Sequence, residues 1–560
     1  MNLLHDPWLP FRAWDGSIAY RPPSAIADSG IVDLALPRAD FQGAAYQWLI
    51  GLLQTALPPK DHDDWLDRVA EPPSCEALEA AFEHLAPAFE LDGDGPRFMQ
   101  DRDPLEDAKP TSVSGLLIDS PGANGLKLNI DHFVKRGRVE AICPDCAALA
   151  LFTLQINAPA GGAGYRVGLR GGGPLTTLVL PEDAQASLWQ RLWLNVMPSQ
   201  SLSRQGKLEA SRSDDDTLFP WMGPTRLSDK KGAVVVPDAM HALHAYWAMP
   251  RRFRLLFEDN PCRCDLCGRE ASRSVGEIRA KNYGANYDGP WQHPLTPYRR
   301  DPKKPNEPPL STKGQPGGLG YRHWSNLVLD DAENSGALSA TVVHDYLHGK
   351  VPANRQARRE GEAFEPLLRH ARLWAFGYDM DNMKPRGWYG VEMPLVAVPS
   401  EQQEVLRSWV QDVTELARQV TWMLRNQIKA AWFSRPADAK GDMSPIDSQF
   451  YEATQAGFFH ALFGMQQALL DGESTHMPME IAEGWYRGLQ REALRLFDAQ
   501  ALTGPMAELD MKRVTGARRN LQAWLSGRSK GSKVITQFAK KGGFALTGSK
   551  ASITAEEVAP

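Results

Sequence analysis

Hydrophobic and polar positions change their spacing near Pro399, and this change divides the chain into two parts. In the first part, the apolar run from Phe41 to Leu57 predicts a buried helix. Short apolar runs such as Thr176–Leu180 predict strands, which are separated by connections rich in glycine and proline. The pattern therefore predicts a mixed α+β domain over residues 1–393.

After Pro399 the apolar residues recur every three or four positions, which is the spacing of a helix with one buried face. The first such helix starts near Ser400 and is about thirty residues long by this pattern. Three more helices are expected, over Phe450–Leu470, Ile481–Leu496 and Met511–Leu525. Four helices joined by short loops predict a four-helix bundle over residues 394–526. Residues 527–560 carry six cations before their first carboxylate, which predicts a basic, flexible tail.

Composition narrows the class of protein. The chain has 560 residues, of which 42% are hydrophobic and 17 are tryptophan, so it can bury a large core. The N-terminus has no basic region followed by an apolar run, and no apolar stretch is long enough to cross a membrane, which predicts a cytoplasmic protein without a membrane partner. The net charge of −6 argues against a protein that coats nucleic acid nonspecifically, but it allows local basic patches.

Two cysteine pairs carry the strongest chemical signal. Cys143 and Cys146 form one C-x2-C turn, and Cys264 and Cys267 form a second more than a hundred residues later. Four such thiolates are the ligands of a closed, tetrahedral structural zinc site, which has no open position for catalysis. We therefore expect one structural Zn²⁺ that clips two distant segments together, with Cys262 outside the site. The alternative is that both turns are redox-active or unpaired.

The densest glycine cluster runs from Asn157 to Pro174. It lacks the Gly-Lys-Ser/Thr of a P-loop and does not fit a dinucleotide fingerprint. Glycines allow close backbone approach to a flat or narrow ligand, and Arg166 and Arg170 could supply charge for phosphates. The alternative is a flexible surface loop.

A second segment, from His132 to Arg138, mixes aromatic and basic residues immediately before the first cysteine pair. This mixture is typical of base stacking combined with phosphate contacts. A solvated loop would have a similar composition.

Several motifs follow one another along the chain, ahead of the expected helical bundle. They are Asn2–Pro10, Cys143–Phe152, Asn157–Pro159, Gly168–Gly172, Cys264–Gly268 and Trp291–Pro294. In this order and spacing they resemble CasA, the large subunit of the type I-E CRISPR surveillance complex Cascade, nearly end to end.

The resemblance implies a non-catalytic subunit of an antiviral complex, with the other Cascade subunits, a CRISPR guide RNA, double-stranded target DNA and a helicase-nuclease as partners. Such a subunit recognises the protospacer-adjacent motif and starts strand separation. It implies that His132, Phe133, Lys135, Arg136 and Arg138 contact the guide RNA.

In addition to Arg166 and Arg170, DNA contacts are expected in three elements that the resemblance identifies. These are the glycine turn Ala160, Gly161, Gly162, Ala163 and Gly164; a lysine finger at Lys281 and Asn282; and a wedge hairpin at Asn382, Met383 and Lys384. Three positions depart from the family pattern: Asn282 falls at the finger position itself, Ala163 replaces a glycine, and Met383 replaces a glutamine known at some wedges. These departures predict a different motif preference, and an apolar Met383 is suited to insertion between base steps.

Two other functions are alternatives to this prediction. His344-Asp345, with His293 or His323 and with Asp379, has the residue order of metal-dependent phosphohydrolases of the HD type. A zinc-stabilised scaffold that binds only proteins through its helices is the other alternative.

Overall fold

The structure is a computed structural model. It describes residues 1–122, 127, 135, 137–159, 161–202, 208–230, 233–314, 318–359, 368, 370–381, 384–438, 440–472, 476–504 and 509–546. The chain forms two compact units. The first comprises Met1–Gly318 and Asn326–Leu395, and the second comprises Leu319–Ser325 and Val396–Pro560.

All the strands found in the described residues belong to the first unit. They are β1 (Leu9–Ala13), β2 (Ile18–Arg21), β3 (Ile31–Leu34), β4 (Thr111–Ser112), β5 (Thr176–Pro181), β6 (Arg252–Glu258), β7 (Cys262–Arg263), β8 (Glu270–Ala271), β9 (Ser274–Lys281), β10 (Tyr298–Arg299), β11 (Leu310–Ser311), β12 (Ala337–Leu338), β13 (Ala371–Asp381) and β14 (Lys384–Leu395). They pair antiparallel in small sheets, in the orders β2-β1-β3, β11-β10-β12, β14-β13-β5, β4-β9-β6 and β7-β8.

Its helices are α1 (Ala39–Ala56), α2 (His62–Ala70), α3 (Cys75–Glu83), α5 (Pro144–Asn157), α6 (Leu188–Trp193), α7 (Ser199–Leu202), α8 (His244–Trp247), α10 (Thr341–Asp345) and α11 (Val351–Arg359). The five-residue helix α9 (Trp324–Val328) begins in the second unit and ends in the first. A π-helical turn, η8 (Tyr346–Lys350), joins α10 to α11.

The core of the first unit is built around α1 and α5, which contact each other. Both helices are buried on nearly all sides, as expected for helices whose sequence is apolar all round. Several polar side chains among them have hydrogen-bond partners: Gln54, for example, bonds both the N–H and the C=O of Met197. The predicted helix at Phe41–Leu57 and the predicted strand at Thr176–Leu180 are both confirmed.

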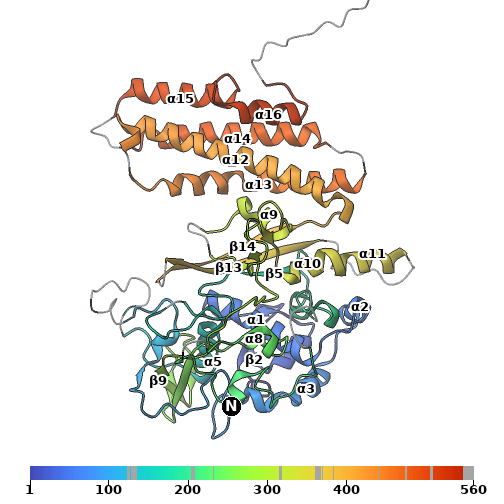
Figure 1. Ribbon diagram of the computed structural model, residues 1–560, viewed down its shortest axis with the longest axis vertical. Helices are drawn as coiled ribbons and strands as arrows, with labels where there is room; N and C mark the ends of the chain where they lie inside the picture. Colours follow the sequence, from blue (N-terminus) through green and yellow to red (C-terminus); the bar gives the residue numbers. More distant parts are fainter. Residues whose placement is uncertain are drawn as a thin grey trace, which may run out of the picture. The chain divides into compact units, whose positions relative to one another are not determined.

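The second unit is helical, with α12 (Gln403–Trp432), α13 (Ser444–Leu470), α14 (Met479–Gln500), α15 (Met511–Leu525) and α16 (Lys533–Lys541). Helix α12 contacts the other four, and α13 and α14 run beside it (Figure 1). The predicted thirty-residue helix is confirmed as α12, whose buried stripe includes Trp409, Val413 and Leu416. The fold is therefore mixed α+β with a C-terminal helical region, as the sequence predicts.

The prediction of a flexible tail from residue 527 is wrong for residues 533–546. This stretch contains α16, whose Ile535 and Phe538 are buried. The Phe544 ring packs against Tyr486 of α14 and against Phe538. The tail prediction failed because it weighed the lysines and ignored an apolar stripe at helical spacing.

A short segment from the middle of the chain belongs to the helical unit. The ring of Tyr321 is fully buried and stacks on Phe458 of α13 at 4.6 Å between centroids. Its hydroxyl lies 2.9 Å from the Thr454 hydroxyl. Residues 319–325 are thus part of the core of this unit, although seventy residues separate them from its other segment.

In the described part of the chain, no helix combines the length and the apolar character that a membrane span requires.

Candidate metal centre and nucleic-acid interface

The two cysteine pairs come together in the first unit. Cys143 caps the N-terminus of α5, Cys146 lies in its first turn, and Cys264 and Cys267 occupy the turn between β7 and β8. The four sulfur atoms all lie within 4.8 Å of one another, and the sulfurs of Cys143 and Cys267 are 3.8 Å apart. A tetrahedral site with Zn–S bonds of about 2.3 Å separates its sulfurs by about 3.8 Å. This cysteine quartet could therefore coordinate a metal ion, and an all-thiolate set suits Zn²⁺.

Hydrogen bonds hold the two cysteine turns side by side. The Asp265 carboxylate accepts the N–H groups of Glu140 and Ala141, both at 2.8 Å. Arg269 forms an ion pair of 2.7 Å with Asp145, whose pKa is raised to about 6 because burial disfavours its charged form. The segments are thus oriented by contacts other than sulfur, as the surroundings of metal ligands commonly are.

The glycine turn and the end of strand β9 meet at the surface of the first unit. The Asn282 side chain donates a 2.8 Å hydrogen bond from Nδ2 to the Ala163 carbonyl, and the Tyr283 N–H donates one of 2.8 Å to the Gly164 carbonyl. Gly164 has a φ of +78°, and a Cβ added there would lie 2.9 Å from the Asn282 Cβ. Two elements that are far apart in the sequence therefore form one exposed surface, which we call the turn–finger surface: Gly161–Tyr165 with Lys281–Tyr283.

Not every predicted DNA-binding residue is available at this surface. Ala160 lies outside the described residues. Gly162 and Ala163 are exposed, whereas Arg166 is half-buried and bonds the hydroxyl and carbonyl of Ser228 at 2.7 and 2.9 Å. Lys281 is 27% exposed and forms an ion pair with Asp107.

The prediction that Arg170 contacts phosphates is wrong. Its side chain is 3% exposed, and its guanidinium donates to Gln47, Thr176, Thr296 and the Ile156 carbonyl. Burial lowers its pKa to about 10. Arg170 is therefore a core hydrogen-bond donor that ties α1 and α5 to β5.

The predicted wedge lies at the end of the β13–β14 hairpin. Asp381 pairs with Lys384, and the two residues between them, Asn382 and Met383, lie outside the described residues. Lys384 is exposed. Strand β13 packs closely against the glycine segment near the end of the hairpin, because a Cβ added at Gly173 would lie 2.5 Å from the Met380 side chain.

Of the predicted RNA-binding residues, His132, Phe133 and Arg136 lie outside the described residues. Lys135 and Arg138 are both exposed. The Arg138 N–H donates a 3.2 Å hydrogen bond to the Lys135 carbonyl.

Sequence reasoning missed two tyrosines at the turn–finger surface. Tyr165 is 44% exposed and Tyr283 is 41% exposed. Tyr283 adopts a φ of +63°, and Arg251 lies over the Tyr165 ring at 5.0 Å. The positive φ follows from the turn that leaves β9, and no local sequence signal marked it.

The residues of the phosphohydrolase alternative do not form a metal site. His344 pairs with Asp330 at 2.8 Å, His293 is 3% exposed, and Asp379 pairs with Arg386. Asp345 is held by His62 at 3.1 Å and by Lys350 at 3.1 Å. Among the described residues, the cysteine quartet is the one group of three or more histidine, cysteine, aspartate or glutamate side chains that could hold a metal ion.

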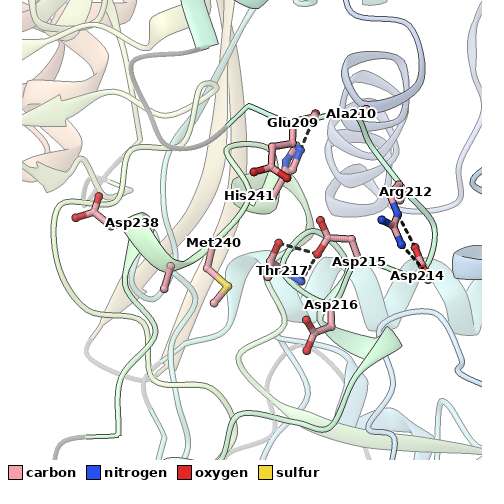
Figure 2. Close-up of a pocket in the computed structure, with 11 residues that line it drawn as sticks. Glu209, Ala210, Arg212, Asp214, Asp215, Asp216, Thr217, Asp238, Met240 and His241 are labelled. Atoms are coloured by element: carbon pink, nitrogen blue, oxygen red, sulfur yellow. Dashed lines mark hydrogen bonds and ion pairs between the residues drawn. The ribbon is translucent and has the colours of Figure 1, made fainter.

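A pocket of about 440 Å³ in the first unit has an acidic lining (Figure 2). Three of its carboxylates have partners: Asp214 pairs with Arg212 at 2.7 Å, Asp215 accepts from the Thr217 hydroxyl at 2.7 Å, and Asp216 pairs with Arg226 at 3.1 Å. A lining of this sign repels phosphates. The turn–finger surface is therefore the better candidate for nucleic acid.

These features define a class: a two-unit α+β protein with a four-cysteine centre, an exposed glycine turn and a C-terminal helical region. The family described as CRISPR-associated protein Cse1 matches residues 2–496, so the chain belongs to this family.

Solved structures agree with this assignment. Cse1 from Thermobifida fusca is 17% identical with a TM-score of 0.66, and the match covers 98% of this chain and 99% of that one. Cse1 from Acidimicrobium ferrooxidans is 18% identical with a TM-score of 0.64, over 96% and 99%. A chain of a structure titled a CRISPR RNA-guided surveillance complex is 15% identical with a TM-score of 0.64, over 94% and 99%. At these identities the likeness establishes the fold.

Proposed function

We propose that the protein is the non-catalytic large subunit of an RNA-guided CRISPR surveillance complex. In this role it recognises a protospacer-adjacent motif in double-stranded DNA, starts strand separation and recruits a helicase-nuclease. Family membership supports the class of complex. The observation that carries motif recognition is the contact of Asn282 with the glycine turn, since it joins two predicted DNA-binding elements in one exposed surface.

The chemistry of this surface suits the minor groove of DNA. Its glycines let the backbone approach the DNA closely. The Asn282 Nδ2 donates its hydrogen bond to the Ala163 carbonyl. The Oδ1 atom has no partner among the described residues and can accept a hydrogen bond. The guanine amino group is the one donor that base pairs present in the minor groove, so Asn282 would favour motifs with a G·C pair at its position.

The remaining roles follow from the family resemblance. Met383 would insert between base steps beside the motif, with Asn382 and Lys384 contacting the strands. Phe133 and its basic neighbours would hold the guide RNA, while sequence specificity would come from guide pairing. The helices α12–α15 would act as a four-helix bundle that docks other subunits, and the cysteine quartet would bind a structural Zn²⁺.

Motif recognition is tested with the complex reconstituted around a guide RNA. Fluorescence anisotropy would compare target duplexes that carry the preferred motif or a scrambled one. Asn282→Ala should reduce the preference by about tenfold, because one good base contact contributes about 1–3 kcal/mol. Asn260→Ala, at an exposed asparagine that bonds Glu258, is the matched control. Unchanged discrimination in Asn282→Ala would remove the turn–finger surface from motif recognition.

Strand separation and guide binding need separate measurements. Met383→Gly should slow R-loop formation on an intact duplex and spare a target that is already unpaired beside the motif, as read by permanganate footprinting. The triple change Phe133→Ala, Lys135→Ala and Arg136→Ala should reduce incorporation into the RNA-bearing complex. Normal assembly with no motif preference in the wild-type complex would favour the protein-binding scaffold instead.

A further inference from the structure

The last two described helices carry a concentration of positive charge. Residues 511–546 contain nine lysines and arginines and no carboxylate, in a chain whose net charge is −6. The segment includes α15, α16 and the turn between them, and Figure 1 shows the two helices following one another along one side of the helical unit. It also lies beyond residue 496, where the match to the Cse1 family ends. The function proposed above therefore does not account for it.

Most of these cations are exposed and unpaired. Arg518 and Lys541 have ion pairs, with Asp498 and Asp412 respectively. Six others are exposed and have no ion pair among the described residues: Lys512, Arg519, Arg528, Lys530, Lys533 and Lys540. We call these six the α15–α16 basic surface.

The helices present some of these cations in a regular way. Lys512 and Arg519 are seven residues apart on one face of α15, and Lys533 and Lys540 have the same spacing on α16. Seven residues span about 10 Å of helix, which is about three phosphate steps along one DNA strand. The opposite faces are fixed by burial of Leu521 and Phe538. The cations thus stand on two anchored helices.

Residues 511–546 contribute no exposed ring on which a base could stack. The aromatic residues of this stretch are Trp524, Phe538 and Phe544, which are 3%, 5% and 9% exposed. Proteins that hold single strands combine cations with exposed aromatic side chains, whereas contacts to duplex backbone need only the cations. The composition therefore favours duplex over single-stranded nucleic acid.

We propose that the α15–α16 basic surface binds the sugar–phosphate backbone of duplex DNA without reading its sequence. This inference rests on the proposed function in one respect, namely that duplex DNA is the target of the protein. It adds a second contact, on the helical unit, that would strengthen binding equally for all motifs.

The test uses the full chain and the reconstituted complex. The variant replaces Lys512, Arg519, Lys533 and Lys540 by glutamine. The control replaces four exposed cations that already have carboxylate partners, namely Arg212, Lys304, Arg418 and Arg487, and so changes the net charge equally. Anisotropy of a labelled duplex is followed against KCl concentration, in parallel with a single-stranded RNA of equal length and with phosphatidylserine vesicles.

We expect the variant to bind duplex DNA more weakly, by about tenfold or more. The negative slope of log K against log salt should become less steep by up to about 3.6, because each phosphate contact contributes about 0.9. The control should bind like the wild type. Equal loss in the control, no loss in the variant, or a loss confined to RNA or to vesicles would overturn the proposal.

The two proposals can fail separately. If motif recognition is wrong but this surface is right, the wild type shows no motif preference and the four cations still set its duplex affinity. If this surface is wrong, the variant matches the wild type, and the motif preference and its loss in Asn282→Ala are unaffected.

Discussion

The strongest quantitative prediction concerns Cys264→Ser in the cysteine quartet. The sulfur spacing predicts one zinc per chain, held by Cys143, Cys146, Cys264 and Cys267. Removing one thiolate should release the metal and open a loop of about 120 residues between the two cysteine turns. If the metal acts like a cross-link, closure of a loop of this size contributes about 4.7 kcal/mol.

The same figure converts into a shift of melting temperature. A unit of about 390 residues has an unfolding entropy of about 0.8 kcal/mol/K, so the loss corresponds to about 6 °C. Elemental analysis of freshly purified protein and thermal unfolding followed by tryptophan fluorescence measure the two effects. Cys262→Ser is the control, because Cys262 lies two residues away and outside the quartet. Unchanged zinc in Cys264→Ser, less than half an equivalent in the wild type, or equal loss in Cys262→Ser would refute the assignment.

Three further predictions concern stability and the turn–finger surface. Burial disfavours ionisation of Asp345, but Lys350 and His62 together lower its pKa to about 2 in the folded protein. In the unfolded chain the pKa of an aspartate is near 4. The ionised Asp345 therefore stabilises the fold above about pH 4, and this stabilisation is lost as the pH falls toward 2. Asp345→Asn should therefore lower the melting temperature at pH 7, relative to exposed Asp63→Asn, and the gap should close between about pH 4 and pH 2; a gap that persists at pH 2 would contradict this. Gly164→Ala should cost about 1–3 kcal/mol of folding stability and weaken motif binding, since its φ is +78°, whereas Gly162→Ala has open space around its Cβ within the chain and should leave the stability unchanged; equal stability of the two variants would count against the turn geometry. Phe538→Ala should lower the free energy of unfolding of the helical unit by about 3–5 kcal/mol, as measured by urea denaturation followed by circular dichroism, while the exposed Gln537→Ala should not. Equal stability of the two variants would support a flexible tail instead.

Periodicity and ligand spacing predicted the elements whose signals are local. Helix α12 has a stripe of apolar residues over thirty positions, and the cysteine pairs have the spacing of metal-binding turns. The interaction of Asn282 with the glycine turn could be anticipated only through the family resemblance, because 119 residues separate the two partners.

Arg170 shows why the rest of the site could not be predicted. A glycine-rich neighbourhood and a positive charge favoured a phosphate contact, yet Gln47, Ile156 and Thr296 satisfy its donors inside the core. Thr296 is 126 residues away, so no local pattern signals this burial. The prediction of a flexible tail failed for another reason. Helix α16 has only nine residues, so its short apolar stripe was given too little weight against the lysines.

The burial of Tyr321 in the helical unit has a practical consequence for dividing this protein into fragments. The chain passes between the two units three times, after Gly318, Ser325 and Leu395, so a cut at Leu395 does not separate two complete parts. A fragment that begins at Val396 would lack the ring that stacks on Phe458 and the hydroxyl beside Thr454, and it would expose that apolar surface to water. Expression of the helical region by itself should therefore start from a chain in which residues 319–325 are joined by a linker to Val396. Insertions between Gly318 and Asn326 would likewise disturb the core of the helical unit, which makes this short stretch a poor place for tags or cleavage sites.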